Sequence, residues 1–159
     1  MAVSPSAARR GSAAGRGLAF RPGDVITFGS SGNAGQLQLF GFDLSADLDF
    51  SWTTAKFCGI DIPLAGDVQE CTLEFDYSPW VSGTRVPAQD LFVFINGLFF
   101  HFSRAERQEV ISIPLPPSVI SSRLIQLRLV IPTAVAPRRL GVSADERMLG
   151  FFIRQIALS

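Results

Sequence analysis

The stretch DLFVFINGLFFHF, residues 90–102, decides the fold of this chain. Asn96-Gly97 separates two apolar runs, and Asn-Gly is the strongest short-range signal for a β-hairpin, because both central residues of a type I′ turn need positive φ. Residues 91–95 are apolar at every position, which predicts a strand covered on both faces or a central strand of a sandwich. After the turn, Phe99 and His101 alternate with the other side chains, so we expect their face to be the wetter one.

Short strand patterns continue on both sides of this hairpin. Residues 71–77 alternate most clearly, with an expected inward set that consists of Cys71, Leu73, Phe75 and Tyr77. Residues 57–62, 124–131 and 148–158 are further strand candidates, and one helical turn is expected at residues 118–122. About eight to ten short strands with turn residues between them predict an all-β, jelly-roll-like antiparallel β-sandwich in a single domain.

Composition and charge exclude several classes of function. The chain has 159 residues, of which 47% are hydrophobic and 18% charged. No apolar run approaches the ~20 residues that span a bilayer, so no membrane span is expected. Formal net charge is zero, and the part of the chain that follows the arginines of the first 21 residues is net acidic. We therefore expect no nucleic-acid partner.

The N-terminal residues 1–23 differ in composition from the rest. They are rich in Ala, Ser, Gly and Arg and contain no acidic residue. This composition predicts a flexible tail, with residues 18–20 as candidates to join a sheet edge, followed by the β-sandwich domain at residues 24–159. Because no continuous apolar segment of a secretory signal is present, the expected location is cytoplasmic.

Cysteine and histidine usage gives no expectation of a cofactor or a metal. Cys58 and Cys71 lie at inward positions of two successive strand candidates, where they could face each other across a hairpin. Two buried free thiols are the favoured interpretation. A metal site would need more ligands than these two and the single His101.

The candidates for catalysis are weak, so the chain is expected not to be an enzyme. His101 is the only histidine, and nothing around it resembles a nucleophile elbow. Acidic residues spaced by two, at 47/49 and 74/76, share one face of a strand and leave a glycoside hydrolase as the alternative. The same spacing is typical of any solvated strand face.

Carbohydrate binding is the chemistry that the residue types permit. Sugars stack their apolar faces on exposed aromatic rings, which makes Trp52, Trp80 and Tyr77 candidate platforms. Nearby polar groups such as Asp49 would take the hydroxyls. The alternative for Trp52, a position in the core, is favoured over a role as a platform.

The order of motifs resembles a known family. The motifs are GF (41–42), FSWT (50–53), FVFINGLFF (92–100), SIPLP (112–116), LRLVIPTAVAP (127–137) and LGVSADERMLGFFIRQIAL (140–158). Their order is similar to β-sandwich accessory domains fused to, or encoded beside, bacterial surface-polysaccharide glycosyltransferases. The resemblance implies a non-catalytic role in glycan synthesis or recognition, with a glycan or a glycosyltransferase as partner. Phe42 departs from the tryptophan that is common in that family, and Asp49 from its glutamate, which weakens a sugar site near Trp52.

The closing segment of this motif order adds two candidate residues. Asp145 and Arg147 are spaced by two and project from one side of the loop that enters the last strand. They form either a polar clamp for sugar hydroxyls or, as favoured here, an anchor in which Arg147 holds the loop by bidentate hydrogen bonds. The expected function is a glycan-binding or glycosyltransferase-associated module. The alternative is an interaction protein that forms homo-oligomers through a Phe-rich face, with Phe99, Phe151 and Phe152 as candidates.

Overall fold

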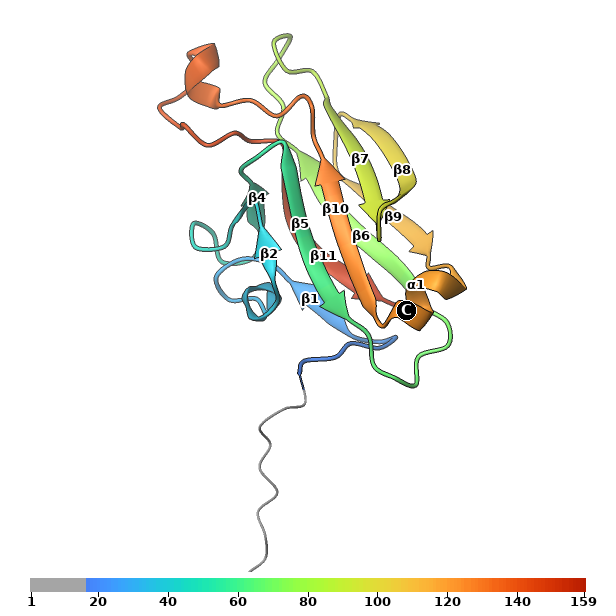
Figure 1. Cartoon of the computed structure of the whole chain (residues 1–159). Helices are drawn as coiled ribbons and strands as arrows, with labels where there is room; N and C mark the ends of the chain where they lie inside the picture. The colour runs from blue at the N-terminus through green and yellow to red at the C-terminus, as the bar shows by residue number, and fades with distance from the viewer. Residues whose placement is uncertain (1–16) are drawn as a thin grey trace, which may run out of the picture.

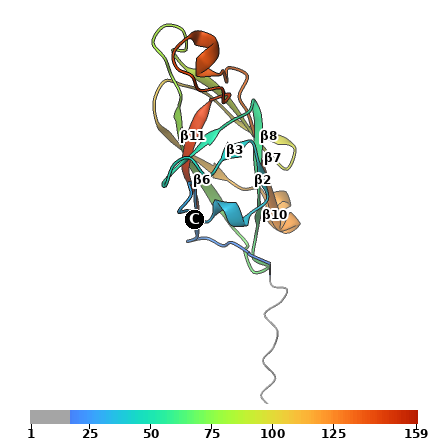
Figure 2. The same ribbon diagram turned by 90° about the vertical axis from the view of Figure 1, so that its left-hand side faces the viewer.

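The chain folds into two antiparallel β-sheets packed face to face, as the computed structural model of residues 17–159 shows (Figures 1 and 2). One sheet has six strands in the order β3-β4-β11-β6-β9, with β1 paired to β11. The other has five strands in the order β2-β5-β10-β7-β8. This arrangement confirms the expected all-β sandwich.

The strands are short, and their bounds follow the turn residues of the sequence. The six-stranded sheet consists of β1 (Val25–Thr27), β3 (Phe42–Asp43), β4 (Ser51–Thr53), β6 (Thr72–Pro79), β9 (Glu109–Pro114) and β11 (Phe151–Leu158). The five-stranded sheet consists of β2 (Leu39–Phe40), β5 (Phe57–Pro63), β7 (Gln89–Ile95), β8 (Leu98–Ala105) and β10 (Leu124–Val130). The connections include the 3₁₀ turns η1 (Ala34–Gln36) and η2 (Pro137–Leu140) and the helix α1 (Pro117–Ser122), which confirms the helical turn expected there.

The connections cross repeatedly between the sheets, as in a jelly roll. Among the described strands, β3–β4 and β7–β8 are neighbours both in sequence and in a sheet, whereas each other step changes sheet. Cys58 on β5 and Cys71 just before β6 therefore belong to opposite sheets. The idea that they face each other across a hairpin is wrong, but both are buried free thiols, as favoured.

The core lies between the sheets and is built from the inward side chain of every second strand residue. The inward set expected for residues 71–77 is buried, and so are the alternating side chains of the strands at residues 57–62 and 124–131: Cys58, Ile60, Ile62, Ile125, Leu127, Leu129 and Ile131. The residues before β1 add to the core: Phe20 is buried, forms a bridge with Leu64, and accepts a hydrogen bond from the Ala65 N–H. Residues 1–16 of the expected tail lie outside the described residues. Among residues 17–159, no helix is long and apolar enough to cross a membrane.

The central hairpin forms as expected, but with one irregularity. Asn96 has φ 51° and Gly97 has φ 80°, the positive values that the turn requires. The register shifts between Val93 and Phe94, so β8 carries one extra residue there. Such a bulge breaks the two-residue alternation. Phe99 and His101 therefore do not share one wet face, contrary to the expectation. Of the two alternatives for residues 91–95, the central strand holds: β7 lies between β10 and β8, with one face buried and the other half-buried.

Candidate binding face

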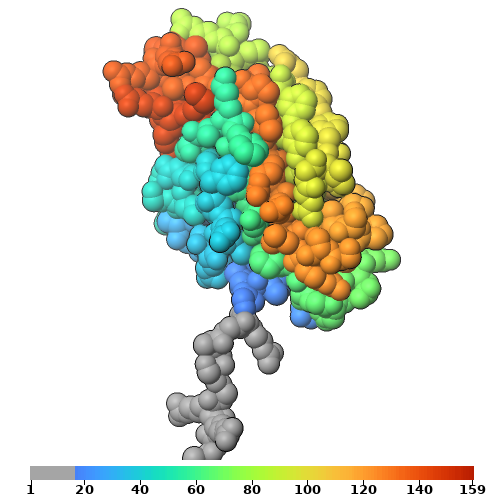
Figure 3. Space-filling view, in the orientation of Figure 1, coloured from blue at the N-terminus to red at the C-terminus, as the bar shows by residue number. Residues whose placement is uncertain are grey.

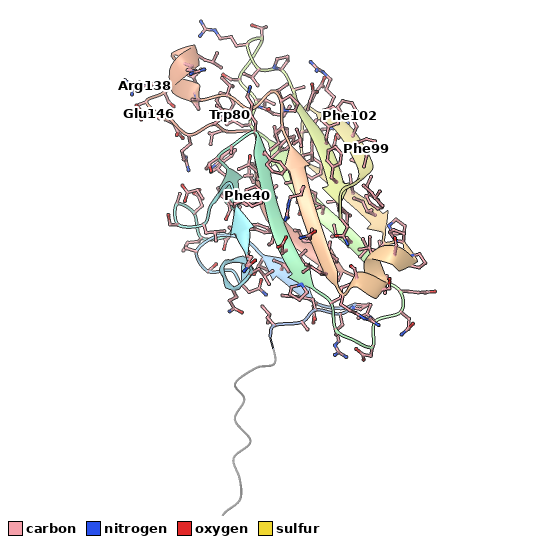
Figure 4. The ribbon with its side chains drawn as sticks, viewed as in Figure 1. Phe40, Trp80, Phe99, Phe102, Arg138 and Glu146 are labelled. Atoms are coloured by element: carbon pink, nitrogen blue, oxygen red, sulfur yellow. The ribbon has the colours of Figure 1, made fainter. Side chains whose placement is uncertain are left out.

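The outer face of the five-stranded sheet, which is turned away from the other sheet, carries aromatic rings. A solvated strand face normally holds polar side chains, yet here four phenylalanines are about half exposed: Phe40 at 42%, Phe57 at 53%, Phe99 at 56% and Phe102 at 48%. Phe92 and Phe94 of β7 lie between them, half-buried. This face is turned toward the viewer in Figures 3 and 4. Such a set of exposed rings marks a contact surface.

The strand register sorts these rings into rows that cross the sheet. One row runs from Phe40 of β2 over Gly59 and Arg128 to Phe94 and Phe99. The parallel row joins Phe57, Val130, Phe92 and Phe102. Within and between rows the rings touch, with centroids 5.2 Å apart for Phe40–Phe57 and 4.8 Å for Phe92–Phe102.

Arg128 lies in the middle of this face. Its guanidinium carbon lies 5.3 Å from the centroid of the Phe40 ring, within the range of a cation–π contact. The neighbouring position is Gly59, and a Cβ atom there would lie 2.7 Å from Cδ of Arg128. Because Gly59 has no side chain, the Arg128 side chain can cross β5 and reach the aromatic ring.

A carboxylate neutralises Arg128. Nη1 of Arg128 lies 2.8 Å from Oδ1 of Asp61 and also donates a hydrogen bond to the carbonyl oxygen of Leu127, at 3.0 Å. Both charged side chains are about one-quarter exposed. Oδ1 of Asp61 accepts no well-aligned hydrogen bond from the described residues, so the contact is an ion pair. The pair places a donor group and an acceptor group side by side without net charge.

A hollow of about 300 Å³ adjoins this pair at the lower end of the sheet. It is lined by residues from β5, β10, the chain around η1 and the segment before β1: Gly17, Leu18, Gln36, Leu37, Gln38, Asp61, Pro63 and Leu124. The Asp61 N–H donates to the Gln38 carbonyl oxygen at 2.9 Å, which holds the η1 segment against β5. Two amide side chains and a carboxylate thus line a shallow apolar hollow, a composition typical of small-molecule sites.

The predicted residue Trp52 lies on the opposite outer face of the sandwich. Its ring is half-buried and packs edge-on against Phe50 and Phe152, with centroids 6.0 and 5.1 Å away. Neither a core position nor a free platform describes this arrangement, because Trp52 is covered mainly by its aromatic neighbours on the sheet surface.

The predicted pair Asp145 and Arg147 is connected to the neighbourhood of Trp52 by Asp43. Arg147 contacts Asp43, and Asp43 on β3 is the strand partner of Trp52 on β4. Arg147 donates from Nη1 to Asp43 at 3.0 Å and from Nη2 to Asp145 at 2.7 Å. The pKa of Asp145 is held below its usual value, chiefly by the hydrogen bond from Arg147. The pKa of Asp43 is also lowered, chiefly by the hydrogen bond from the Ser45 N–H and then by those from the Ser45 hydroxyl and Arg147. These contacts use most of the donors of Arg147, which favours the anchoring role.

The remaining predicted residues are scattered. Tyr77 is fully buried, with a relative exposure of 0%, so its prediction as a sugar platform is wrong: it points inward from β6, where a ring has no free face. Trp80 is half-buried beyond the end of β6, near the upper end of the sandwich in Figure 4, and Asp49 is exposed in the loop before β4. Phe151 is buried, so it cannot belong to an exposed Phe-rich face, and Phe152 lies on the opposite sheet from Phe99.

A second hollow, of about 410 Å³, lies on the lobe that carries η2 and is lined by Ala136, Arg138, Arg139 and Glu146. Arg138 forms an ion pair with Glu146, and both side chains are largely exposed where this lobe projects from the sandwich in Figure 4. Exposed ion pairs of this kind contribute little to stability or specificity. Among residues 17–159, no group of three or more candidate metal ligands is found.

No protein-family model and no curated protein matches this chain. Solved structures with a similar arrangement include three carbohydrate-binding modules. The C-terminal CBM6 of LamC, a laminarinase from Zobellia galactanivorans, gives a TM-score of 0.45 at 8% identity and covers 86% of this chain and 99% of its own. CBM36 in complex with calcium and xylotriose gives 0.47 at 10% identity, with the same coverage of 86% and 99%. CBM51 from a Clostridium perfringens GH95 protein, in complex with methyl-galactose, gives 0.40 at 15% identity and covers 88% and 91%.

At these identities no binding residue can be transferred to this chain. The residues of the outer face are also not among those predicted from the sequence, although a signal for them exists. Asp61 and Arg128 are charged positions within mainly apolar strands, and Gly59 interrupts one of them. Only the register, which brings these three positions together with Phe40, reveals that they form one site.

Proposed function

We propose that this chain is a non-catalytic glycan-binding module that binds an oligosaccharide on the outer face of β2, β5 and β10. The observation that carries the proposal is the exposed ring of Phe40 beside the Arg128–Asp61 ion pair. An exposed ring offers a surface for the C–H face of a sugar ring. The adjacent guanidinium and carboxylate can donate to and accept from its hydroxyl groups.

The hollow beside Asp61 extends this surface. Gln36 and Gln38 each bring an amide, which both donates and accepts, and Leu124 and Pro63 add apolar walls. Since Asp61 neutralises Arg128, the face has no unbalanced charge to attract a sulfated or uronic acid chain. The expected ligand class is therefore a neutral oligosaccharide that spans more than one sugar unit.

The test is a glycan array of the purified protein, followed by calorimetry with the best-binding oligosaccharide. We expect Phe40→Ala and Asp61→Asn each to weaken binding at least about tenfold, which corresponds to ~1.4 kcal/mol. The control is Val110→Ala, which truncates an exposed apolar residue on β9 of the other sheet and should bind as wild type does. Binding that survives Phe40→Ala and Asp61→Asn but is lost in Trp52→Ala would refute this location.

A place in bacterial surface-polysaccharide assembly, beside a glycosyltransferase in the cytoplasm, would fit such a module. That finer role stays a prediction from the motif resemblance. It can be tested by asking whether oligosaccharides of bacterial surface polysaccharides outcompete plant and animal glycans for the face around Phe40.

A further inference from the structure

The part of this outer face on the β7 and β8 side is mainly apolar, in contrast to the charged pair beside Phe40. The phenylalanine patch, defined as Phe57, Phe92, Phe94, Phe99, Phe102 and Val130, lies on the outer side of β5, β7, β8 and β10. Within it, ring centroids are 4.8 Å apart for Phe92–Phe102 and 5.6 Å apart for Phe94–Phe99. In Figure 4, Phe99 and Phe102 lie toward the β8 edge of this face and Phe40 lies toward its β2 edge. Phenylalanine has no polar atom, so this patch offers a ligand no hydrogen bond.

We propose that the phenylalanine patch is the contact surface between two copies of this chain, related by a two-fold axis. A two-fold contact uses the same patch on both partners, so the patch must be complementary to itself in shape and charge. The charged side chains on the outer side of these strands are already paired internally, Arg128 with Asp61 at 2.8 Å and Arg104 with Asp90 at 3.1 Å. When two copies pack through this patch, no unpaired charge of one copy is therefore placed against the same charge of the other.

The size of the patch fits a dimer of modest area. Its three most exposed rings each leave about 100 Å² open, and the half-buried members raise the apolar total to roughly 400 Å². An interface core that is about two-thirds apolar would then bury on the order of 600 Å² per partner, at the lower end of the range for specific contacts. A formal net charge of zero adds no long-range repulsion between copies.

This inference uses other residues than the proposed function, although the two surfaces meet where the Phe57 ring contacts Phe40. The hollow lined by Gln36, Gln38 and Asp61 lies at the far end of β5 from Phe57, so a contact at the patch leaves it open. Two copies joined at their phenylalanine patches would present two glycan sites. A branched or repeating glycan that engages both would be bound with higher effective affinity than by one site.

The experiment is sedimentation velocity with light scattering on the full chain over a dilution series. Wild type should sediment as a dimer that dissociates on dilution, and Phe99→Asp should be a monomer at every concentration. Val110→Asp, which places the same charge on a residue of 61% exposure outside the patch, should remain a dimer. Thermal melting of both variants checks that the fold is kept.

Two further readouts separate the possible occupants. An apolar contact should not weaken as sodium chloride is raised, whereas one held by ion pairs should. Monomeric Phe99→Asp should retain the affinity for a monovalent oligosaccharide. A wild type that is monomeric throughout, or a Phe99→Asp variant that still dimerises, overturns the proposal. If the wild type is monomeric and Phe99→Asp abolishes glycan binding, the patch holds glycan and not a second copy.

Discussion

Arg128 lies directly over Gly59 of the neighbouring strand, and a Cβ atom on Gly59 would come within 2.7 Å of Arg128 Cδ and 2.9 Å of the Leu127 carbonyl oxygen. Gly59→Ala should therefore displace Arg128 from Asp61 and from the Phe40 ring. We expect glycan affinity to fall and stability to drop by about 1–3 kcal/mol from overpacking, measured by calorimetry and urea unfolding.

A double-mutant cycle checks the cause. In an Arg128→Ala background most of the crowding atoms are gone, so Gly59→Ala should cost less stability than in wild type. Equal costs in the two backgrounds would mean that the contact with the Leu127 carbonyl oxygen, and not the arginine, is decisive.

The turn at Asn96 combines a strained backbone with a hydrogen-bond network. Its Oδ1 accepts from the Gln126 N–H at 2.7 Å, and its Nδ2 donates to the Leu124 carbonyl oxygen at 3.0 Å, at a φ of 51°. Asn96→Ala should destabilise the fold by about 2–3 kcal/mol, since it loses these bonds and keeps the left-handed backbone. Asn96→Gly loses the same hydrogen bonds, but glycine adopts the left-handed backbone without steric cost. It should therefore be about 1 kcal/mol less destabilising than Asn96→Ala. Urea unfolding of both variants separates the two contributions.

Arg147 should matter for stability and for its pH dependence more than for binding. Arg147→Ala removes hydrogen bonds to two carboxylates and is expected to cost about 2 kcal/mol, with glycan affinity unchanged. The lowered pKa values of Asp43 and Asp145 contribute stability that is fully present above their ordinary value of 3.8. That contribution is lost as the pH falls through their folded-state pKa values.

Acid titration of the melting temperature therefore measures this anchor. Wild type should lose stability more steeply below about pH 4 than Arg147→Ala, in which the pKa of Asp145 lacks its main cause of depression. Parallel acid profiles for the two proteins would contradict the anchoring role.

A partly buried hydrogen bond between Tyr77 and Glu109 links β6 to β9. The Tyr77 hydroxyl donates to Oε2 of Glu109 at 2.5 Å, and the Ser103 hydroxyl donates to the same oxygen from the opposite sheet, also at 2.5 Å. Glu109→Ala should cost about 1–3 kcal/mol, because the tyrosine hydroxyl is left unsatisfied in the core. Tyr77→Phe should cost less, as the exposed side of Glu109 remains hydrated.

The hydrogen bond between Tyr77 and Glu109 also predicts how stability changes at alkaline pH. Burial first, and then the hydrogen bond to Glu109, raise the pKa of Tyr77 above its ordinary value of 10.0. Because the folded-state pKa is raised, the stability from this group is fully present below pH 10. It is lost as the pH rises from there toward the folded-state pKa. The chain has one tyrosine, so tyrosinate absorbance reports on Tyr77 alone and should rise together with loss of the fold. Tyrosinate formation in a still-folded protein would contradict the buried position.

The sandwich could be predicted from local chemistry. Asn96-Gly97 specifies a turn because few other residues accept its backbone angles, and the alternation in residues 71–77 determines which side chains face the core, since a pleated strand has a period of two. These signals act over a few residues, so they are readable without knowledge of the partner strands. The anchoring role favoured for Arg147 rested on the same kind of short-range reasoning and is supported by its contacts with Asp145.

The binding face depends on contacts between residues distant in sequence, which only the tertiary structure decided. Phe40, Gly59 and Arg128 become neighbours through the registers of β2, β5 and β10, and a shift by one residue would turn each side chain to the opposite face. The bulge in β8 has the same effect on Phe102, which lies on the outer face together with Phe99 although the two are three residues apart. Burial turned Tyr77 from a candidate platform into a core residue. Periodicity determines that a strand has two faces, but which face meets the other sheet and which meets solvent is decided by long-range packing.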